Sequence, residues 1–293
     1  MLISGRSLAS WLSYPGLPDE VVFFDKHMQL PTVSITIVNW NHGHYLKRCL
    51  DALLAQEYRH YDITIVDNGS QDGSPEMLTK EYPEVNLFSF PDNQGFSKAF
   101  NRGVRETSGE FVLSLNPDVF VKKGFLSELV DAIHEDERVG IVSAKLLQFD
   151  DPRILDSAGL FLNRSRRPYD RGQGEIDEGQ YDHSLNLFGS CGAAALYRRS
   201  MLDDVALNNE YLDEDFFAYY EDVDLAWRVQ LRGWKGRYTP LAVATHVRGW
   251  GDTLRKNRDP TNGNSGARLA LRNRYLMIIK NDTLSNFLLD LPL

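Results

Sequence analysis

The chain has 293 residues, of which 42% are hydrophobic and 25% are charged, and these proportions are typical of a folded globular protein. It contains two cysteines, Cys49 and Cys191, without the spacing of a disulfide framework or a zinc site. With 32 basic and 41 acidic residues its net charge is −9, which argues against nucleic acid as a partner. We find no secretion signal and no apolar run of about 18 residues, so we expect a cytoplasmic protein.

From Val33 onward, short β-branched runs alternate with segments of helical periodicity. The pattern predicts strands at 33–38, 61–66, 85–89, 111–115 and 140–145, and helices at 45–56, 74–81, 95–107 and 123–135. Such alternation is typical of a mostly parallel central sheet flanked by helices, so the predicted fold class is α/β. Residues 1–31 show no periodicity and contain three prolines, and we interpret them as an N-terminal leader.

Beyond residue 145 the pattern becomes less regular. Arginines and glycines recur over residues 163–182, which predicts a long mobile loop. A helix is predicted at 221–232, where Asp224 and Arg228 can pair. Residues 203–224 hold nine acidic and no basic residues, whereas 245–280 hold eight basic residues and two acidic ones. These blocks indicate either two solvated faces or a carboxylate and metal site beside a diphosphate-binding surface.

Three polar clusters directly follow predicted strands: Asn39-Trp-Asn41, Asp67-Asn-Gly-Ser70 and Asn116-Pro-Asp118. The carboxyl ends of parallel strands meet at one edge of a sheet, where such folds bind their ligands. Asp67 could accept hydrogen bonds from a base or ribose, and Asp118 could hold a hard divalent cation with Asn116 beside it. Taken alone, each cluster is also explained by ordinary turn chemistry.

Two further groups of candidate residues lie nearer the C-terminus. Glu221 and Asp222 open the helix at 221–232, where crowded carboxylates could supply a general base or could simply cap the helix. His246 follows a strand-like run at 241–245 and could complete a metal site begun by Asp118, while Arg248 could hold a phosphate oxygen. The alternative for His246 is a purely structural role.

Joined in this order, the clusters resemble the family 2 glycosyltransferases, which have the nucleotide-diphosphosugar fold called GT-A. The resemblance covers about residues 33–280. It rests on Val33–Asn41, Ile65–Ser70, Asn93-Gln-Gly-Phe96 with Asn101-Arg-Gly103, Leu115–Asp118, Glu221–Leu225 and His246. Asn116 departs from the pattern, because much of the family has Asp at both ends of the metal motif. The missing charge should weaken metal binding.

The resemblance implies a role for each matching residue. Asn39, Asn41 and Asp67 would bind the nucleoside of a nucleotide-sugar donor, and Asn93, Gly95 and Asn101 would line its diphosphate and sugar. Asp118 and His246 would bind a divalent metal, Mg²⁺ or Mn²⁺, with Asn116 beside it and Arg248 near the donor phosphates. Asp222 would be the catalytic base, with Glu221 as the alternative. The segment Gly189–Ala195 looks like the family's acceptor-side stretch.

The implied reaction is an inverting sugar transfer. The Asn-Pro-Asp motif and Arg272-Asn-Arg-Tyr275 resemble the rhamnosyltransferases, whose donor is dTDP-rhamnose. The implied acceptor is a glycan or lipid-linked glycan in cell-surface polysaccharide synthesis. A UDP-hexose or UDP-galactofuranose donor is the rival within this class. A catalytically inactive scaffold that binds sugar nucleotides is the alternative from another class.

The implied organisation is a GT-A catalytic domain at 32–245, with a donor half at about 32–120 and an acceptor half at about 121–245. A basic C-terminal segment at 246–293 would complete the site. Between Arg268 and Lys280 basic and apolar residues interleave. This pattern predicts a peripheral contact, either with the inner face of the plasma membrane or with a lipid diphosphate. The alternative is a terminal helix with a solvated basic face.

Overall fold

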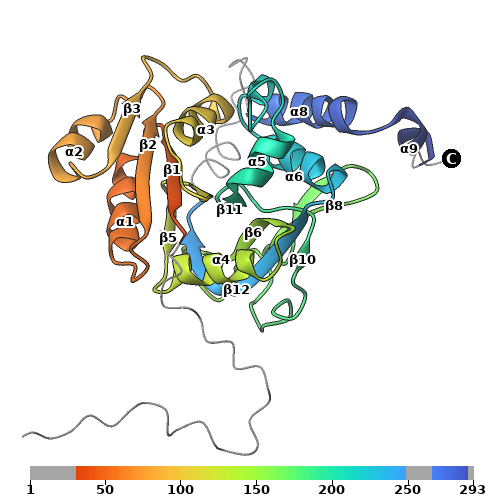
Figure 1. The fold of residues 1–293 in the computed structure, drawn as a ribbon, viewed down its shortest axis with the longest axis horizontal. Coiled ribbons are helices and arrows are strands. Elements are labelled where there is room, and N and C mark those ends of the chain that lie inside the picture. Colours follow the sequence, from red (N-terminus) through yellow and green to blue (C-terminus); the bar gives the residue numbers. More distant parts are fainter. Residues whose placement is uncertain (1–30, 249–265, 290–293) are drawn as a thin grey trace, which may run out of the picture. The chain divides into compact units, whose positions relative to one another are not determined.

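The computed structural model describes residues 31–248 and 266–289 (Figure 1). The predicted leader, apart from Pro31, lies outside the described residues, and so do residues 249–265 and 290–293 of the predicted basic C-terminal segment.

Strands and helices follow one another as the hydrophobic pattern predicts, with shorter strands added in the second half of the chain. The strands are β1 (Val33–Asn39), β2 (Tyr61–Asp67), β3 (Asn86–Ser89), β4 (Phe111–Leu115), β5 (Val119–Val121), β6 (Val139–Gln148), β7 (Leu155–Ser157), β8 (Leu160–Leu162), β9 (Pro168–Asp170), β10 (Asn186–Leu187), β11 (Ala194–Arg198) and β12 (Lys235–His246). The helices are α1 (Gly43–Leu54), α2 (Ser74–Glu81), α3 (Phe96–Arg105), α4 (Phe125–His134), α5 (Arg199–Val205), the 3₁₀ turn η2 (Glu214–Phe216), α6 (Glu221–Leu231), α8 (Gly266–Asn281) and α9 (Leu284–Leu289).

A central sheet runs through the described part of the chain in the order β10-β12-β6-β11-β4-β1-β2-β3. Strands β3, β2, β1 and β4 are parallel, as are β6 and β12, whereas β11 is antiparallel to both β4 and β6. The predicted α/β class with a central sheet flanked by helices is therefore confirmed (Figure 1). Periodicity does not report strand direction, so the reversal at β11 was not predicted.

Each face of the sheet packs against its own set of helices, because successive strand residues point to opposite sides. In β1, Val33, Ile35 and Ile37 lie in one buried cluster with the apolar residues of α1 and α4. Val38 belongs to a second cluster, which includes residues of α3, α5 and α6. Burying a large aliphatic side chain of this kind stabilises the fold by about 1.5–3 kcal/mol. The two-sided packing holds the carboxyl ends of the strands in fixed positions.

The segment 163–182 is more structured than the predicted long mobile loop. It contains β9, which pairs with β8, and its Arg171 is buried. The Arg171 guanidinium donates to the carbonyls of Ala158 and Ser184 and lies 5.0–5.1 Å from the ring centroids of Phe161, Tyr181 and Tyr238. Arginine is usually a solvated residue, so the sequence pattern gave no indication that aromatic rings from distant segments would surround Arg171.

Within residues 31–248 and 266–289, no helix is long and apolar enough to cross a membrane.

Candidate active site

The first polar cluster forms where β1 and β2 end side by side, because Asn39 pairs in register with Asp67. Asn39 is fully buried, and its Nδ2 lies 3.0 Å from Asp67 Oδ1, 3.1 Å from Ser70 Oγ and 2.8 Å from Ser74 Oγ. Its Oδ1 has no hydrogen-bond partner among the described residues. Asn41 is exposed, and its Oδ1 accepts a bond of 2.8 Å from the Gln71 amide. The structure therefore brings the three predicted nucleoside residues to one edge of the sheet.

The loop before α3 is closed by Asn93, whose Oδ1 accepts bonds from Asn68 Nδ2 (3.0 Å) and from the Gly95 amide (2.9 Å). Gly95 has φ +89°, and an added Cβ would lie 2.6 Å from the Phe217 ring and 2.7 Å from its carbonyl oxygen. Only glycine fits this position, because both the backbone angle and the close approach exclude a side chain. The loop is thereby held against residue 217 of the acidic stretch.

Asn101 also joins α3 to the acidic stretch. Its side chain is fully buried; Nδ2 donates to the Leu212 carbonyl (2.7 Å) and to Glu214 Oε1 (3.1 Å), and Oδ1 accepts from the Leu212 amide (2.9 Å). Both ends of this amide are satisfied by protein groups. Asn101 therefore links α3 to residues 212–214, and its expected place beside the donor stays a prediction.

The second polar cluster lies between β4, β11 and β12. The Asn116 amide donates to the Ala193 carbonyl (2.9 Å), which ties the Asn-Pro-Asp turn to the start of β11. After the turn, β5 pairs with β12 so that Val119 lies opposite His246. This pairing places His246 Nε2 3.5 Å from Asp118 Oδ1, with both side chains buried. The predicted pair of metal ligands is thus brought together by residues far apart in sequence.

Asp156 on β7 stands behind His246 and was not predicted. It is buried, and its Oδ2 lies 2.8 Å from His246 Nδ1. Burial lowers the pKa of His246, but the carboxylates of Asp118 and Asp156 outweigh it and raise the pKa to about 9. An imidazole held by a carboxylate at Nδ1 presents Nε2 in a fixed direction, which is the arrangement common among metal-ligating histidines.

The structure pairs Arg248 with two carboxylates, and its expected contact with a donor phosphate stays a prediction. Its Nε contacts Asp156, and one Nη lies 2.9 Å from Asp170 Oδ2. The guanidinium thus links β7 to β9 beside the His246 pair. The sequence shows an arginine two residues after His246, but it could not predict the contacts of this arginine with Asp156 and Asp170, which come from a distant segment.

The residues around Asp118 suit a divalent cation. A carboxylate oxygen of Asp118 and the Nε2 of His246 face each other, and the buried Asp156 holds the other ring nitrogen of His246. Among residues 31–248 and 266–289, no group of three or more His, Cys, Asp or Glu side chains could hold a metal ion. Mg²⁺ and similar ions commonly take few protein ligands and complete their shell with substrate phosphates and water. The donor set therefore fits an ion that binds together with a diphosphate.

The candidate base lies at the N-terminal end of α6, close to the start of β11. Asp222 Oδ2 accepts a hydrogen bond of 3.0 Å from the Gly192 amide, and Oδ1 accepts one of 2.8 Å from the Val223 amide. Burial raises the pKa of Asp222 despite these two bonds, and the charge of Asp170 adds to the effect. Because Gly192 directly precedes Ala193, the candidate base and the Asn116 turn are connected through the short turn that leads into β11.

Glu221 is buried beside Asp222, and its Oε2 has no hydrogen-bond partner among the described residues. Burial raises the pKa of Glu221 strongly, and the neighbouring Asp222 charge raises it further. Two backbone amides stabilise the ionised form of Asp222 and none is bonded to Glu221 Oε2, so Asp222 is the better candidate for a carboxylate that accepts a proton.

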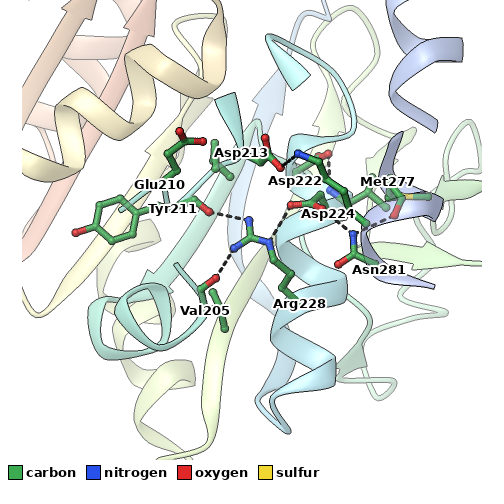
Figure 2. Close-up of polar contacts among 12 residues, drawn as sticks. Val205, Glu210, Tyr211, Asp213, Asp222, Asp224, Arg228, Met277 and Asn281 are labelled. Carbon is green, nitrogen blue, oxygen red and sulfur yellow. Dashed lines mark hydrogen bonds and ion pairs between the residues drawn. The ribbon is translucent and has the colours of Figure 1, made fainter. Parts of the chain in front are cut away.

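Part of the acidic block is an internal network (Figure 2), because Asp213 and Asp224 are buried, whereas Asp203, Asp204 and Asp215 are exposed. The predicted pair is confirmed: Arg228 Nε lies 2.9 Å from Asp224 Oδ2, and both side chains are buried. Arg228 also donates to the carbonyls of Val205 and Tyr211, as Figure 2 shows. This network fixes α6 against α5 and the strand-like segment before η2.

The basic residues of α8 were expected to face an anionic surface or solvent, and three of them instead contact the protein. Arg272 donates to the carbonyls of Asp215 and Phe216, and Arg274 donates to that of Ser165 (2.9 Å). Lys280 pairs with Asp213 and Asp215. Lys280 therefore forms ion pairs with the acidic block, whereas Arg272 and Arg274 bond to backbone carbonyls, and none of these contacts could be predicted from either block alone.

Comparison with known proteins identifies this arrangement. The sequence model of the family described as "Glycosyl transferase family 2" matches residues 34–206, which hold the β1, β2 and β4 clusters. The chain belongs to glycosyl transferase family 2. Within this family, an N-acetylglucosaminyl-diphospho-decaprenol L-rhamnosyltransferase of Mycobacterium tuberculosis is 30% identical over 243 residues, which cover 74% of this chain and 75% of that protein.

Other relatives are more distant. A poly-beta-1,6-N-acetyl-D-glucosamine synthase of Staphylococcus aureus is 26% identical over 219 residues, and the chain spans 50% of its length. Among solved structures, GalNAc-T7 with UDP, GalNAc and Mn²⁺ is similar at a TM-score of 0.64 and 16% identity, covering 85% of this chain and 48% of that one. Mannosyltransferase PcManGT from Pyrobaculum calidifontis, with GDP-Man and Mn²⁺, reaches 0.57 at 17% identity, covering 89% and 79%. These likenesses show the GT-A fold.

Asp156 is a neighbour of the candidate metal pair that sequence reasoning missed. It does carry a signal, since it is an acidic residue inside the largely apolar segment Ile154–Ala158. Gly192 falls within the predicted acceptor-side stretch Gly189–Ala195, but the bond from its amide to Asp222 could not be predicted, because it joins residues 30 positions apart.

Proposed function

We propose that the chain is an inverting glycosyltransferase that moves a sugar from a nucleoside-diphosphate donor onto a hydroxyl group of an acceptor. The observation that carries the proposal is the convergence of two groups on the turn just before β11. Asp222 is bonded to Gly192, and the Asn116 turn, which leads to Asp118 and His246, is bonded to Ala193. A candidate base and a candidate cation pair are thus attached to adjacent residues of one turn.

In this reaction the acceptor oxygen forms a bond to the anomeric carbon while the bond from that carbon to the diphosphate oxygen breaks. Asp222 would take the proton of the acceptor hydroxyl, and the Gly192 and Val223 amides would orient its carboxylate. Asp118 and His246 would hold the divalent cation, and Asp156 would keep His246 directed at it. The cation, when bound, neutralises the charge that develops on the leaving diphosphate.

We propose L-rhamnose from dTDP-rhamnose as the donor. The support is the mycobacterial relative named as a rhamnosyltransferase, together with the Asn-Pro-Asp and Arg272–Tyr275 motifs. A UDP-hexose or UDP-galactofuranose is the rival donor, and the staphylococcal relative named as a poly-N-acetylglucosamine synthase favours a UDP-sugar. An inactive scaffold that binds sugar nucleotides is disfavoured by the fixed geometry around both Asp118 and Asp222.

For the acceptor we propose a glycan or a lipid-linked glycan. A contact with a membrane surface is supported by Leu271, Tyr275 and Ile279, which are exposed at spacings of four residues on α8. Liposome flotation of the full chain and of a variant with serine at these three positions tests the contact. Loss of binding in the variant supports it, whereas failure of both proteins to bind excludes it.

The experiment that tests the proposed function is release of nucleoside diphosphate from a panel of sugar nucleotides, with and without Mg²⁺ or Mn²⁺. Wild type and Asp118→Ala are compared with Asp150→Ala, an exposed acidic residue, as the control. Metal-dependent turnover of dTDP-rhamnose that Asp118→Ala alone abolishes is the expected result. Turnover of a UDP-sugar in its place would change the donor, and absence of both binding and turnover would favour the scaffold.

A further inference from the structure

The segment that leads into the candidate base is a turn at 216–220 with an unfavourable backbone. Phe217, Tyr219 and Tyr220 have φ values of 64°, 70° and 71°, in the left-handed region that side chains other than glycine rarely adopt. Tyr220 is directly followed by Glu221 and Asp222. Three such residues within four positions persist only when surrounding contacts determine the conformation.

The contacts that determine this turn come from α8. Asn273 is fully buried, and its Nδ2 lies 2.8 Å from the Phe216 carbonyl, 2.8 Å from that of Ala218 and 2.7 Å from that of Tyr219. An amide group has two N–H bonds, so one of them is shared between two carbonyls. Asn273 Oδ1 accepts a bond of 2.9 Å from Arg272 Nε, which fixes the orientation of the amide.

Two further residues on the same face of α8 contact η2 and α6. Met277, one turn further along, is fully buried in a cluster with Phe216 and Val223. Asn281, one turn beyond that, donates to Asp224 Oδ1 at 2.7 Å, as Figure 2 shows. The spacing of four residues places all three side chains along the turn and the first turns of α6.

The turn also touches the donor side of the site. Its Phe217 packs so closely on Gly95 that no side chain fits there, and the Phe217 carbonyl accepts a bond of 3.2 Å from the Ser97 amide at the start of α3. The turn therefore lies between the loop closed by Asn93 and the carboxylate of Asp222. Contacts that fix the turn at 216–220 therefore also fix the position of Asp222 relative to the Asn93 loop.

We propose that Asn273 is a positioning residue for sugar transfer, which holds the carbonyls of residues 216, 218 and 219 and thereby places Asp222. The inference rests on the proposed function, because it assigns Asn273 to the same reaction. It makes no contact with Asp222 itself, and its effect is transmitted through the backbone of the turn. A displacement of about 1 Å at a reacting group can lower the rate about a hundredfold.

The test compares Asn273→Ala, Asn273→Ser and Asn281→Ala in the full chain. Asn281→Ala removes the same amide from the same helix but leaves the turn carbonyls bonded, so it is the matched control. In Asn273→Ala we expect kcat to fall at least about tenfold while KM for the donor stays within about threefold. Serine keeps one donor group and should recover part of kcat. Asn281→Ala should retain a kcat close to that of wild type at temperatures where all variants are folded.

A second measurement is independent of turnover. Hydrogen exchange at the amides of Ala218 and Ser97, which bond to carbonyls of the turn, should accelerate in Asn273→Ala and not in Asn281→Ala. Unchanged exchange in Asn273→Ala would overturn the positioning role, whichever donor is used. Equal losses of kcat in Asn273→Ala and Asn281→Ala would also overturn it. If wild type turns over no donor, the proposed function fails, while the exchange data still decide whether Asn273 holds the turn.

Discussion

Glu221 and Asp222 carry neighbouring carboxyl groups that differ in their hydrogen-bond partners, and we expect them to differ in their roles. Asp222 accepts two backbone hydrogen bonds, whereas Glu221 is buried with an unpartnered Oε2. We predict that Asp222→Asn lowers kcat by about a hundredfold or more, because it removes the proton acceptor, while donor affinity changes little. Glu221→Gln mimics a protonated side chain and should keep kcat within about tenfold. Steady-state kinetics and donor titration check both variants. The reverse order of the two effects would assign the base to Glu221.

The raised pKa of Glu221 has a consequence for stability. Below the pKa of an unfolded glutamate, about 4.3, both states are protonated and burial of the carboxyl group imposes no ionisation penalty. Between this pH and the raised folded-state pKa, the unfolded state is ionised while the folded state keeps its proton, so the free energy of unfolding falls as the pH rises. Glu221→Gln removes this loss, so its free energy of unfolding relative to wild type should increase with pH. Urea unfolding from about pH 4 to 8 measures it, with the exposed Glu178→Gln as control. A difference independent of pH would contradict the prediction.

Asp156 determines how His246 is presented, since its Oδ2 bonds to Nδ1 and leaves Nε2 facing Asp118. Loss of such a second partner typically lowers metal affinity by about 10–100-fold, and we expect this range for Asp156→Asn. Mn²⁺ titration in the presence of dTDP, followed by the electron paramagnetic resonance of free Mn²⁺, measures the change. Asp170→Asn removes a partner of Arg248 but none of His246, so it should leave the affinity near that of wild type. Equal affinities in all three proteins would contradict the assignment.

At the scale of elements, the contact between α3 and the turn at 216–220 depends on Gly95. Its φ of +89° and the 2.6 Å approach of Phe217 act together, so Gly95→Ala must displace either α3 or the turn. Gly174 has φ +83°, and a Cβ added there would have no other atom within 4 Å. Gly174→Ala therefore isolates the backbone cost of a side chain at positive φ, about 1–2 kcal/mol. We predict that Gly95→Ala lowers the free energy of unfolding by more than this and also lowers kcat. Similar losses of stability in the two variants, with kcat intact, would contradict the close contact.

The elements also show which features a sequence can predict. Strands β1, β2 and β4 and helices α1 to α4 were predicted because local apolar periodicity alone decides them. The same regularity placed Asn39, Asp67 and Asp118 at one edge of the sheet. Asp156 and the reversed strand β11 were not predictable, because each depends on pairing between distant segments. The contacts of Arg272 and Lys280 were not predictable for the same reason, since the Asp215 carbonyl bonded to Arg272 and the Asp213 carboxylate bonded to Lys280 lie some 60 residues away.

At the scale of the whole molecule, the two halves of the site are held by one continuous set of contacts. The Asn93 loop reaches the turn at 216–220 through Gly95, and the turn leads into Asp222. Asp222 reaches the Asn116 turn through the start of β11. α8 supports the turn from outside the family-matched region 34–206. A helix that contributes no candidate catalytic group is therefore part of the structure that holds the candidate base.

This dependence can be tested by shortening the chain at two points. Removing residues 266–293 takes away Asn273, Met277 and Asn281, and it should lower the free energy of unfolding by about 4 kcal/mol or more, since a buried side chain contributes about 1.5–3 kcal/mol and each hydrogen bond about 1. A stop after Thr283 removes α9, whose Leu284, Phe287 and Leu289 are exposed, and keeps every contact of α8 with the turn. The change there should stay below about 1 kcal/mol, with kcat retained. Urea unfolding and donor turnover measure both proteins. If the longer deletion remained as stable and as active as the shorter one, the turn would be held by its own residues and α8 would have no part in the site.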